Sequence, residues 1–78
     1  MHRVVLFSRP GCHLCDVARD TLLDVRERTP FEFEEVDIER DDDLELEYGI
    51  RIPVIEVDGE ECFEVSVDPA SFARIVET

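Results

Sequence analysis

A short, uninterrupted apolar run near the N-terminus sets the tightest limit on the fold. Residues Val4 to Phe7 are all apolar, without the polar alternation of a strand that faces water on one side. Such a run is typical of a central strand that is covered on both faces. The run therefore predicts an α/β fold in which helices cover both faces of a sheet.

An amphipathic helix is predicted directly after this strand. The segment Ser8-Arg9-Pro10-Gly11 breaks the apolar pattern, and apolar residues at three-and-four spacing follow it. The members of this stripe are Leu14, Val17, Ala18, Leu22 and Val25. We expect the helix to end at Thr29-Pro30, because a residue before proline is disfavoured in the helical conformation.

The rest of the chain contains five further elements. Phe31 to Ile38 is predicted to be a strand, and Asp41 to Tyr48 a short acidic helix that Gly49 closes. Two more strands, Val54 to Val57 and Cys62 to Val67, flank Asp58-Gly59, which is a strong hairpin signal.

A final helix is predicted at the C-terminal end. Asp68 is a good N-cap, Pro69 suits the first helical position, and Phe72, Ile75 and Val76 form its apolar stripe. The predicted order is strand–helix–strand–helix–strand–strand–helix (βαβαββα), in a single domain spanning residues 1–78 with a four-stranded mixed sheet. The first three elements should form a right-handed parallel crossover.

The charge balance excludes several functions. The chain has 21 acidic and 8 basic residues, and its formal net charge is −13. A field of this sign repels phosphate backbones, so we expect no nucleic-acid partner. No stretch approaches the roughly 20 apolar residues of a membrane span, and no segment has the pattern of a signal peptide. We therefore expect a cytoplasmic monomer that does not bind membranes.

Two of the three cysteines form a Cys-x-x-Cys pair where the first strand gives way to the first helix. Cys12 lies at the predicted helix start, where unpaired backbone N–H groups and the helix dipole favour a thiolate. Cys15 lies one turn further and can reach back to Cys12. We predict that Cys12 is the nucleophile and Cys15 the resolving thiol, with His13 adding positive charge when it is protonated.

A metal site is the alternative for such a pair. A structural zinc site needs four ligands, and the chain has no second pair at ligand spacing. We therefore favour redox chemistry and expect no metal. A non-catalytic binding module of the same fold, with an idle or metal-bound pair, remains the second hypothesis.

At this point the chain resembles the glutaredoxin-like branch of the thioredoxin superfamily, particularly its short bacterial and archaeal members. The resemblance rests on Ser8-Arg9-Pro10-Gly11-Cys12-His13-Leu14-Cys15-Asp16, on Tyr48-Gly49-Ile50-Arg51-Ile52-Pro53-Val54, and on the order of the elements. It implies a thioredoxin/glutaredoxin fold. It also implies a thiol–disulfide oxidoreductase that transfers electrons to protein or small-molecule disulfides.

The resemblance also implies a substrate site around the cysteine pair. In this family the proline that opens the third strand is cis and faces the cysteines, and Pro53 matches it. Ile52 would then give main-chain hydrogen bonds to a bound peptide or to glutathione. The further residues predicted to contact substrate are Arg9, Gly11, His13 and Arg51, the two arginines by steering an anionic partner.

Two departures from the family pattern concern glutathione. The family typically has a proline after the first cysteine, where this chain has His13. It also has a Gly-Gly pair before the last helix, where this chain reads Ser66-Val67-Asp68-Pro69. These residues offer fewer backbone donors and add a negative charge. We expect no tightly bound cofactor, and we name protein disulfides and a thiol reductant (glutathione or a thioredoxin-like protein) as partners.

Overall fold

The order of the elements is the one that the sequence predicts. The computed structural model describes residues 1–78. Its elements are β1 (Arg3–Ser8), α1 (His13–Arg28), β2 (Glu32–Asp37), the 3-10 helix η1 (Ile38–Arg40), α2 (Asp42–Tyr48), β3 (Val54–Val57), β4 (Glu60–Glu64) and α3 (Pro69–Glu77). Only the single turn of η1 was not expected.

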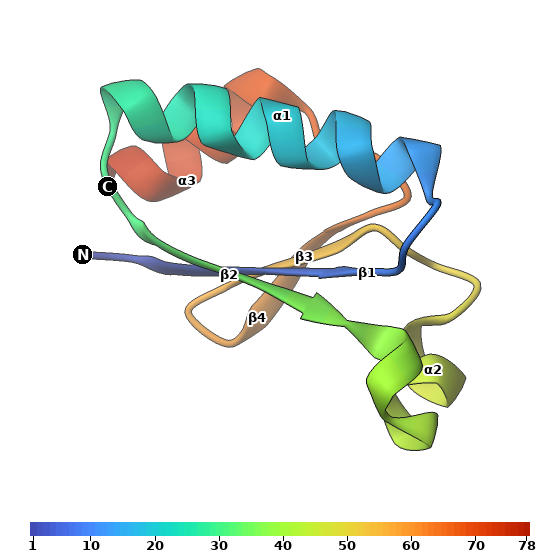
Figure 1. Ribbon diagram of the computed structural model, residues 1–78. Helices are drawn as coiled ribbons and strands as arrows, with labels where there is room; N and C mark the ends of the chain where they lie inside the picture. Colours follow the sequence, from blue (N-terminus) through green and yellow to red (C-terminus); the bar gives the residue numbers. More distant parts are fainter.

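The four strands form one mixed sheet in the order β2-β1-β3-β4. β1 is parallel to β2 and antiparallel to β3, and β3 is antiparallel to β4. α1 and α3 lie side by side over one face, whereas α2 lies at the other face near one end of the sheet (Figure 1). The predicted α/β architecture with helices on both faces is therefore confirmed.

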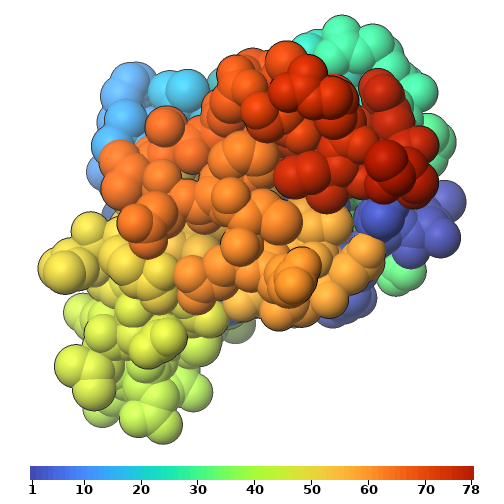
Figure 2. Space-filling model, turned by 180° about the vertical axis from the view of Figure 1, so that it is seen from behind, coloured from blue at the N-terminus to red at the C-terminus, as the bar shows by residue number.

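The core is divided by the sheet into two parts. The larger part lies between the sheet and the helices α1 and α3, and includes Phe72, whose ring meets Phe31 edge-on at 5.4 Å. The smaller part lies under α2 and contains Phe7, on which Tyr48 stacks at 4.2 Å. Seen from behind, α2 and the chain that follows it project as a lobe beyond the sheet (Figure 2).

The buried face of α1 differs from the predicted stripe. Ala18, Leu22 and Val25 are buried as expected, but Leu14 and Val17 are each 50% exposed. Cys15 takes the buried position at this end of the helix instead. The physical reason is that the face toward the sheet is centred on Cys15, so that Leu14 and Val17 lie beside it. They line a small hollow between α1 and the segment that joins β4 to α3.

β3 and the turn of the hairpin lie where the sequence predicts them, but β4 begins and ends earlier than predicted. Asp58 and Gly59 both have positive φ, of 54° and 87°, as a two-residue turn of this kind requires. β4 is Glu60–Glu64 rather than the predicted Cys62 to Val67. Val65 has a φ of 70°, and its N–H bonds to the carbonyl oxygens of Arg51 and Pro53, which takes the chain out of the ladder.

A register shift opposite Ile55 and Glu56 also breaks the alternation along β4. As a result Cys62 and Phe63 both pack against the larger core, although strict alternation would place them on opposite faces. α3 begins as predicted: Asp68 caps it by accepting from the N–H of Ser71 at 3.0 Å, and Pro69 is the first helical residue. None of the helices has the length and apolar character needed to cross a lipid bilayer.

Candidate functional site

The cysteine pair lies where α1 begins. Cys12 is the N-cap residue, with extended backbone angles, and its Sγ accepts the N–H of Cys15 at 3.2 Å. The carbonyl of Cys12 accepts the N–H of Asp16 at 3.1 Å, which is the first hydrogen bond of the helix. The sulfur of Cys12 therefore occupies the place of a capping oxygen, at the positive end of the helix dipole.

The two sulfurs differ in their access to solvent. Their Cα atoms are 5.2 Å apart and the sulfurs lie at disulfide bonding distance. Cys15 is completely buried, whereas Cys12 is partly exposed. Only Cys12 can therefore be reached by a substrate while the domain stays folded.

The residues on either side of Cys12 are exposed. Gly11 has a φ of 79°, a conformation that other residues rarely adopt, and a Cβ placed on it would meet open space. His13 is the first residue of α1 and its side chain is exposed. Both residues lie beside the pair, and their predicted contact with a substrate stays a prediction.

Pro53 lies at the same end of the sheet as the cysteine pair. The peptide bond between Ile52 and Pro53 is cis, as the resemblance implies. Phe7 pairs with Val54 across β1 and β3, so Pro53 lies level with the end of β1, just before the loop that leads to Cys12. The backbone groups of Ile52 take no part in the hydrogen bonds of the loops, which leaves them free for another chain.

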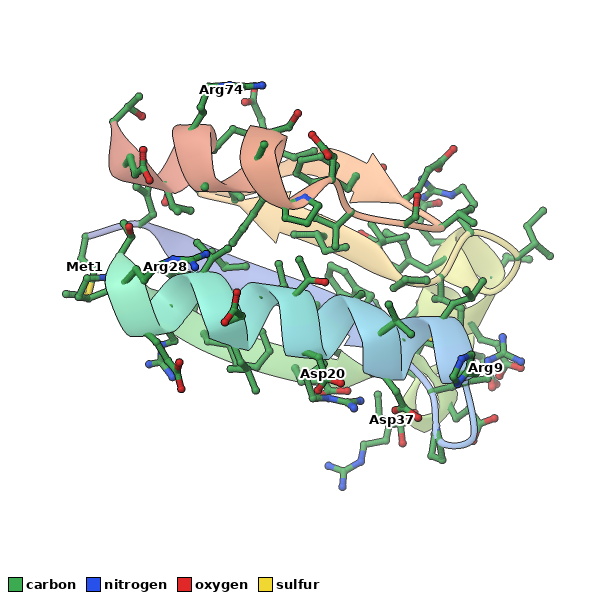
Figure 3. All side chains as sticks on the ribbon, turned by 90° about the horizontal axis from the view of Figure 1, so that it is seen from above. Met1, Arg9, Asp20, Arg28, Asp37 and Arg74 are labelled. Carbon is green, nitrogen blue, oxygen red and sulfur yellow. A yellow bond between two sulfur atoms is a disulfide. The ribbon has the colours of Figure 1, made fainter.

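Arg9 joins the loop before Cys12 to the end of α2. Its Nη2 donates to the carbonyl of Gly49 at 3.0 Å, and its Nε is buried without a partner. Figure 3 shows Arg9 beside the start of α1, at the end of the molecule where the chain after α2 also lies. The guanidinium is thus partly used within the chain.

Arg51 is engaged with three glutamates. Its Nη1 donates to Glu61 at 2.8 Å and to Glu64 at 3.1 Å, and its Nη2 lies 3.7 Å from Glu47. Its guanidinium also lies 5.3 Å from the centre of the Tyr48 ring. The hydrogen bonds with Glu61 and Glu64 raise the pKa of Arg51 and lower that of Glu61.

A polar network beneath the start of α1 was not predicted. Arg19 donates to Glu35 on β2 at 2.5 and 2.7 Å and to Asp16 at 2.9 Å, and Ser8 donates to Glu35 at 2.6 Å. The hydrogen bonds from Arg19 lower the pKa of Glu35, and burial opposes this shift. Spacing along the helix could have revealed the pair of Asp16 and Arg19. The partner on β2 depends on strand register, which the sequence does not show.

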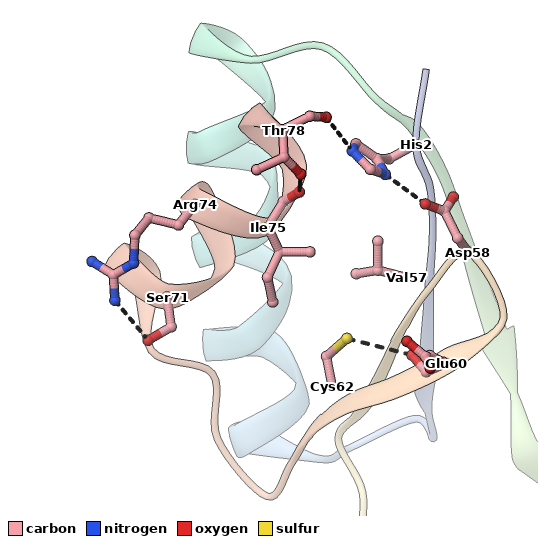
Figure 4. Close-up of a pocket in the computed structure, with 9 residues that line it drawn as sticks. All are labelled: His2, Val57, Asp58, Glu60, Cys62, Ser71, Arg74, Ile75 and Thr78. Atoms are coloured by element: carbon pink, nitrogen blue, oxygen red, sulfur yellow. Dashed lines mark hydrogen bonds and ion pairs between the residues drawn. The ribbon is translucent and has the colours of Figure 1, made fainter.

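One hollow in the surface lies away from the cysteine pair. It has a volume of about 500 Å³ and is lined by residues that include His2, Cys62 and Arg74, with no member of the Cys-x-x-Cys pair (Figure 4). The hollow beside the Arg9–Gly11 loop is smaller, at about 320 Å³. The larger of these two hollows is therefore not the one beside the cysteine pair.

Cys62 is the one free cysteine. Its Sγ lies 3.5 Å from the carbonyl oxygen of Glu60. Burial raises the pKa of this thiol, and the charges of Glu60 and Asp58 add to the effect. The structure contains no group of three or more His, Cys, Asp or Glu side chains placed to hold a metal ion.

Comparison with known protein families identifies one matching family. Residues 3–77 match the model of the family described as "Glutaredoxin-like domain (DUF836)". No curated protein matches the chain.

Several solved structures are similar to this chain over most of its length. The protein XcR50 from X. campestris is 32% identical, with 95% of each chain covered and a TM-score of 0.78. The protein Ne2328 from Nitrosomonas europaea is 25% identical, with 96% of this chain and 91% of that chain covered and a TM-score of 0.83. A mutant thioredoxin from Halobacterium salinarum NRC-1 is 22% identical, covered over 97% of this chain and 72% of that chain, with a TM-score of 0.71. The last comparison shows that the fold is the thioredoxin fold.

Proposed function

The chain belongs to the glutaredoxin-like domain family (DUF836), and we propose that it is a thiol–disulfide oxidoreductase whose reacting groups are Cys12 and Cys15. The observation that carries this proposal is the asymmetry of the pair. The partly exposed sulfur caps the start of α1, and the buried sulfur lies one turn along the helix behind it. A nucleophile must be reachable and ionised, whereas a resolving thiol needs only to reach the first sulfur.

The first step is attack by the Cys12 thiolate on one sulfur of a disulfide. A bond forms between Cys12 Sγ and that sulfur, the substrate S–S bond breaks, and the leaving sulfur takes up a proton. The N–H of Cys15, which points at Cys12 Sγ, stabilises the anion before attack. Backbone donors at a helix start supply this stabilisation without any movement of side chains.

The second step is attack by Cys15 on Cys12 Sγ. Cys15 loses a proton, the mixed disulfide breaks, and the second half of the substrate leaves as a thiol. The substrate disulfide has then gained two electrons and two protons, and the pair has become a disulfide. The short distance between the two Cα atoms, 5.2 Å, lets the pair pass between both states within the first helical turn.

We propose that Ile52 and cis-Pro53 align the substrate. The backbone groups of Ile52 are free, and this segment lies at the same end of the sheet as Cys12. An extended peptide could pair with Ile52 as an added strand does, which would bring its disulfide to the sulfur. Gly11 and His13 would flank the same substrate.

We propose that glutathione is not held in the way usual for the family and that no cofactor is tightly bound. The carboxylate of Asp68 already accepts the N–H and the hydroxyl of Ser71 at the start of α3. An incoming carboxylate would meet a negative charge there instead of free donors. Protein disulfides and a thiol reductant are the proposed partners of a monomer in the cytoplasm.

The test uses the reduced protein and the neutral substrate hydroxyethyl disulfide. We expect wild type to oxidise its pair, Cys15→Ser to stop at a mixed disulfide on Cys12 that mass spectrometry detects, and Cys12→Ser to form none. A metal assay on protein purified without chelator accompanies it. Stoichiometric metal bound to the reduced pair, with no reaction, would contradict the proposal and favour the binding module.

A further inference from the structure

Two groups of carboxylates lie at the end of the sheet where α1 starts. Asp16, Glu35 and Asp37 line the hollow beside the Arg9–Gly11 loop. Glu47, Glu61 and Glu64 surround Arg51.

The second group lies at the same end of the sheet as the first. Glu64 pairs with Val54 across β3 and β4, and Val54 pairs with Phe7 near the end of β1. A substrate that approaches Cys12 beside Ile52 and Pro53 therefore passes between two acidic groups.

Two of the three arginines beside this site are paired with carboxylates. Arg19 is bound by Asp16 and Glu35, and Arg51 by its three glutamates. Arg9, the third, donates to the carbonyl of Gly49. Six carboxylates against three arginines leave the surroundings of the pair negative.

Three of these carboxylates are exposed to solvent, although each also lies beside an arginine. The side chains of Asp16, Glu47 and Glu64 are 61%, 65% and 55% exposed. Between them lies uncharged surface: Leu14, Val17 and Val65 are each about half exposed and line one narrow hollow along α1. This surface can contact a substrate of either charge, so the choice between charges falls to the acidic rim.

We propose that this site selects disulfides that carry cationic groups beside the sulfurs, and discriminates against anionic ones. The inference rests on the proposed function and names its substrate class. A positive group next to the substrate disulfide is attracted by the rim and by the net charge of −13. A carboxylate in the same place is repelled, because the six carboxylates outnumber the three arginines, and Arg19 and Arg51 are already paired with acids.

The exchange itself is unchanged by this selection. Cys12 attacks one sulfur of the cationic disulfide and its first half leaves as a thiol, and Cys15 then displaces the second half. Two electrons and two protons pass from the pair to the substrate, and no other reductant takes part in this half-reaction. The selection acts on the encounter and on the alignment of the substrate.

The experiment compares three small disulfides with the reduced protein. Cystamine is cationic, hydroxyethyl disulfide is neutral and dithiodiglycolate is anionic. Each second-order rate constant is divided by that of the same disulfide with dithiothreitol, which removes differences in intrinsic reactivity. The series is run at about 10 mM KCl, where the Debye length is roughly 30 Å, and at about 1 M KCl, where it is roughly 3 Å.

We expect the normalised rate for cystamine to exceed that for dithiodiglycolate on the order of tenfold at low salt, and the ratio to approach one at high salt. A ratio near one at low salt, or a ratio that salt does not change, would overturn the inference. Hydroxyethyl disulfide separates this failure from failure of the proposed function. If it oxidises the pair normally the oxidoreductase stands, and if it does not react the oxidoreductase itself is wrong.

A pair of matched variants locates the effect. Asp16→Asn with Glu47→Gln removes two charges beside the cysteine pair, whereas Glu27→Gln with Glu77→Gln removes two exposed charges at the ends of α1 and α3. Both variants change the net charge equally. We expect the first to lower the low-salt ratio roughly threefold and the second to leave it nearly unchanged. Equal effects would overturn the assignment to the rim.

Discussion

Two regions of this small fold each carry a cysteine that could react, the start of α1 and the edge strand β4, and their surroundings differ. At the start of α1, Cys12 is partly exposed and its sulfur accepts a backbone N–H. On the edge strand β4, Cys62 lies by a larger hollow, near the carbonyl of Glu60, and its pKa is raised by burial. The backbone N–H favours the anion of Cys12, whereas at Cys62 burial and the charges of Glu60 and Asp58 outweigh the one backbone hydrogen bond, from Val57, that favours the thiolate.

We infer from this comparison that the direction of the neighbouring backbone groups decides the reactivity of a cysteine here, more than the size of the adjacent pocket. A helix start offers unpaired N–H groups that favour an anion. A strand edge beside a hairpin turn offers Cys62 no such group of donors, and the neighbouring Asp58 and Glu60 oppose a thiolate. Cys62 also has no second cysteine near it in sequence to complete an exchange.

The largest expected effect separates the two cysteines by function. Cys12→Ser should reduce the oxidation of the remaining thiols by disulfides to the background rate, because Cys15 is buried and the thiolate of Cys62 is disfavoured. Cys62→Ser should keep the wild-type rate. Stopped-flow mixing with hydroxyethyl disulfide measures both. A large loss of rate in Cys62→Ser would break the comparison.

The next effect concerns the stability of the larger core under α1 and α3, against which Cys62 packs. Phe72 is fully buried between Phe31 and Phe63, so Phe72→Ala should lose about 3–5 kcal/mol of unfolding free energy. Phe72→Leu keeps an apolar side chain and should lose less. Urea unfolding measures the loss.

In the folded fraction of Phe72→Leu, we expect Cys12 to react with hydroxyethyl disulfide at the wild-type rate. A slower reaction under native conditions would show that the redox pair is not independent of the core around Phe72.

A smaller effect is the difference in thiol reactivity within one reduced molecule. We expect iodoacetamide to modify Cys12 at least about tenfold faster than Cys62 at neutral pH. One unit of pKa difference already gives that ratio of thiolate fractions. Peptide mass spectrometry after short labelling times gives both rates from one sample. Equal rates would remove the contrast on which the comparison depends.

Much of the fold was predictable because its signals are local. Asp58-Gly59 fixes a two-residue hairpin, Asp68-Pro69 starts a helix, and the run Val4 to Phe7 indicates a central strand. The early end of β4 was not predictable, because it depends on the bonds of Val65 to Arg51 and Pro53, which lie more than ten residues back along the chain.

In the candidate site, too, the local features were predictable and the contacts between distant parts of the chain were not. The cysteine pair and the cis-Pro53 were expected from short motifs. The burial of Cys15 in place of Leu14 was not, because a shift of one residue in the helix phase is within the uncertainty of an apolar stripe. The engagement of Arg51 by Glu61 and Glu64 depends on the hairpin register, which only the folded chain establishes.

The smallest expected effect is at the end opposite the cysteine pair. His2 bonds to Asp58 at 2.5 Å and to the carbonyl of Thr78 at 2.9 Å. The hydrogen bond to Asp58 is the main cause that raises the pKa of His2 above its ordinary 6.5. The stabilisation by protonated His2 is therefore complete below pH 6.5 and is lost as the pH rises through the raised pKa.

We expect His2→Gln to lower the melting temperature slightly below pH 6.5, with a difference from wild type that shrinks at alkaline pH. Thermal unfolding across this pH range measures it, and His13→Gln is the matched control at an exposed position. A difference that does not change with pH would show that the contact acts through packing instead of charge.

The most direct test of the central claim is the titration of Cys12 alone, in a protein that carries both Cys15→Ser and Cys62→Ser. The ultraviolet absorbance of the thiolate, followed against pH in the folded and the urea-unfolded protein, gives the pKa in each state. We predict a clearly lower pKa in the folded protein, because the start of α1 holds the anion. Equal values, or a higher value in the folded protein, would contradict the account.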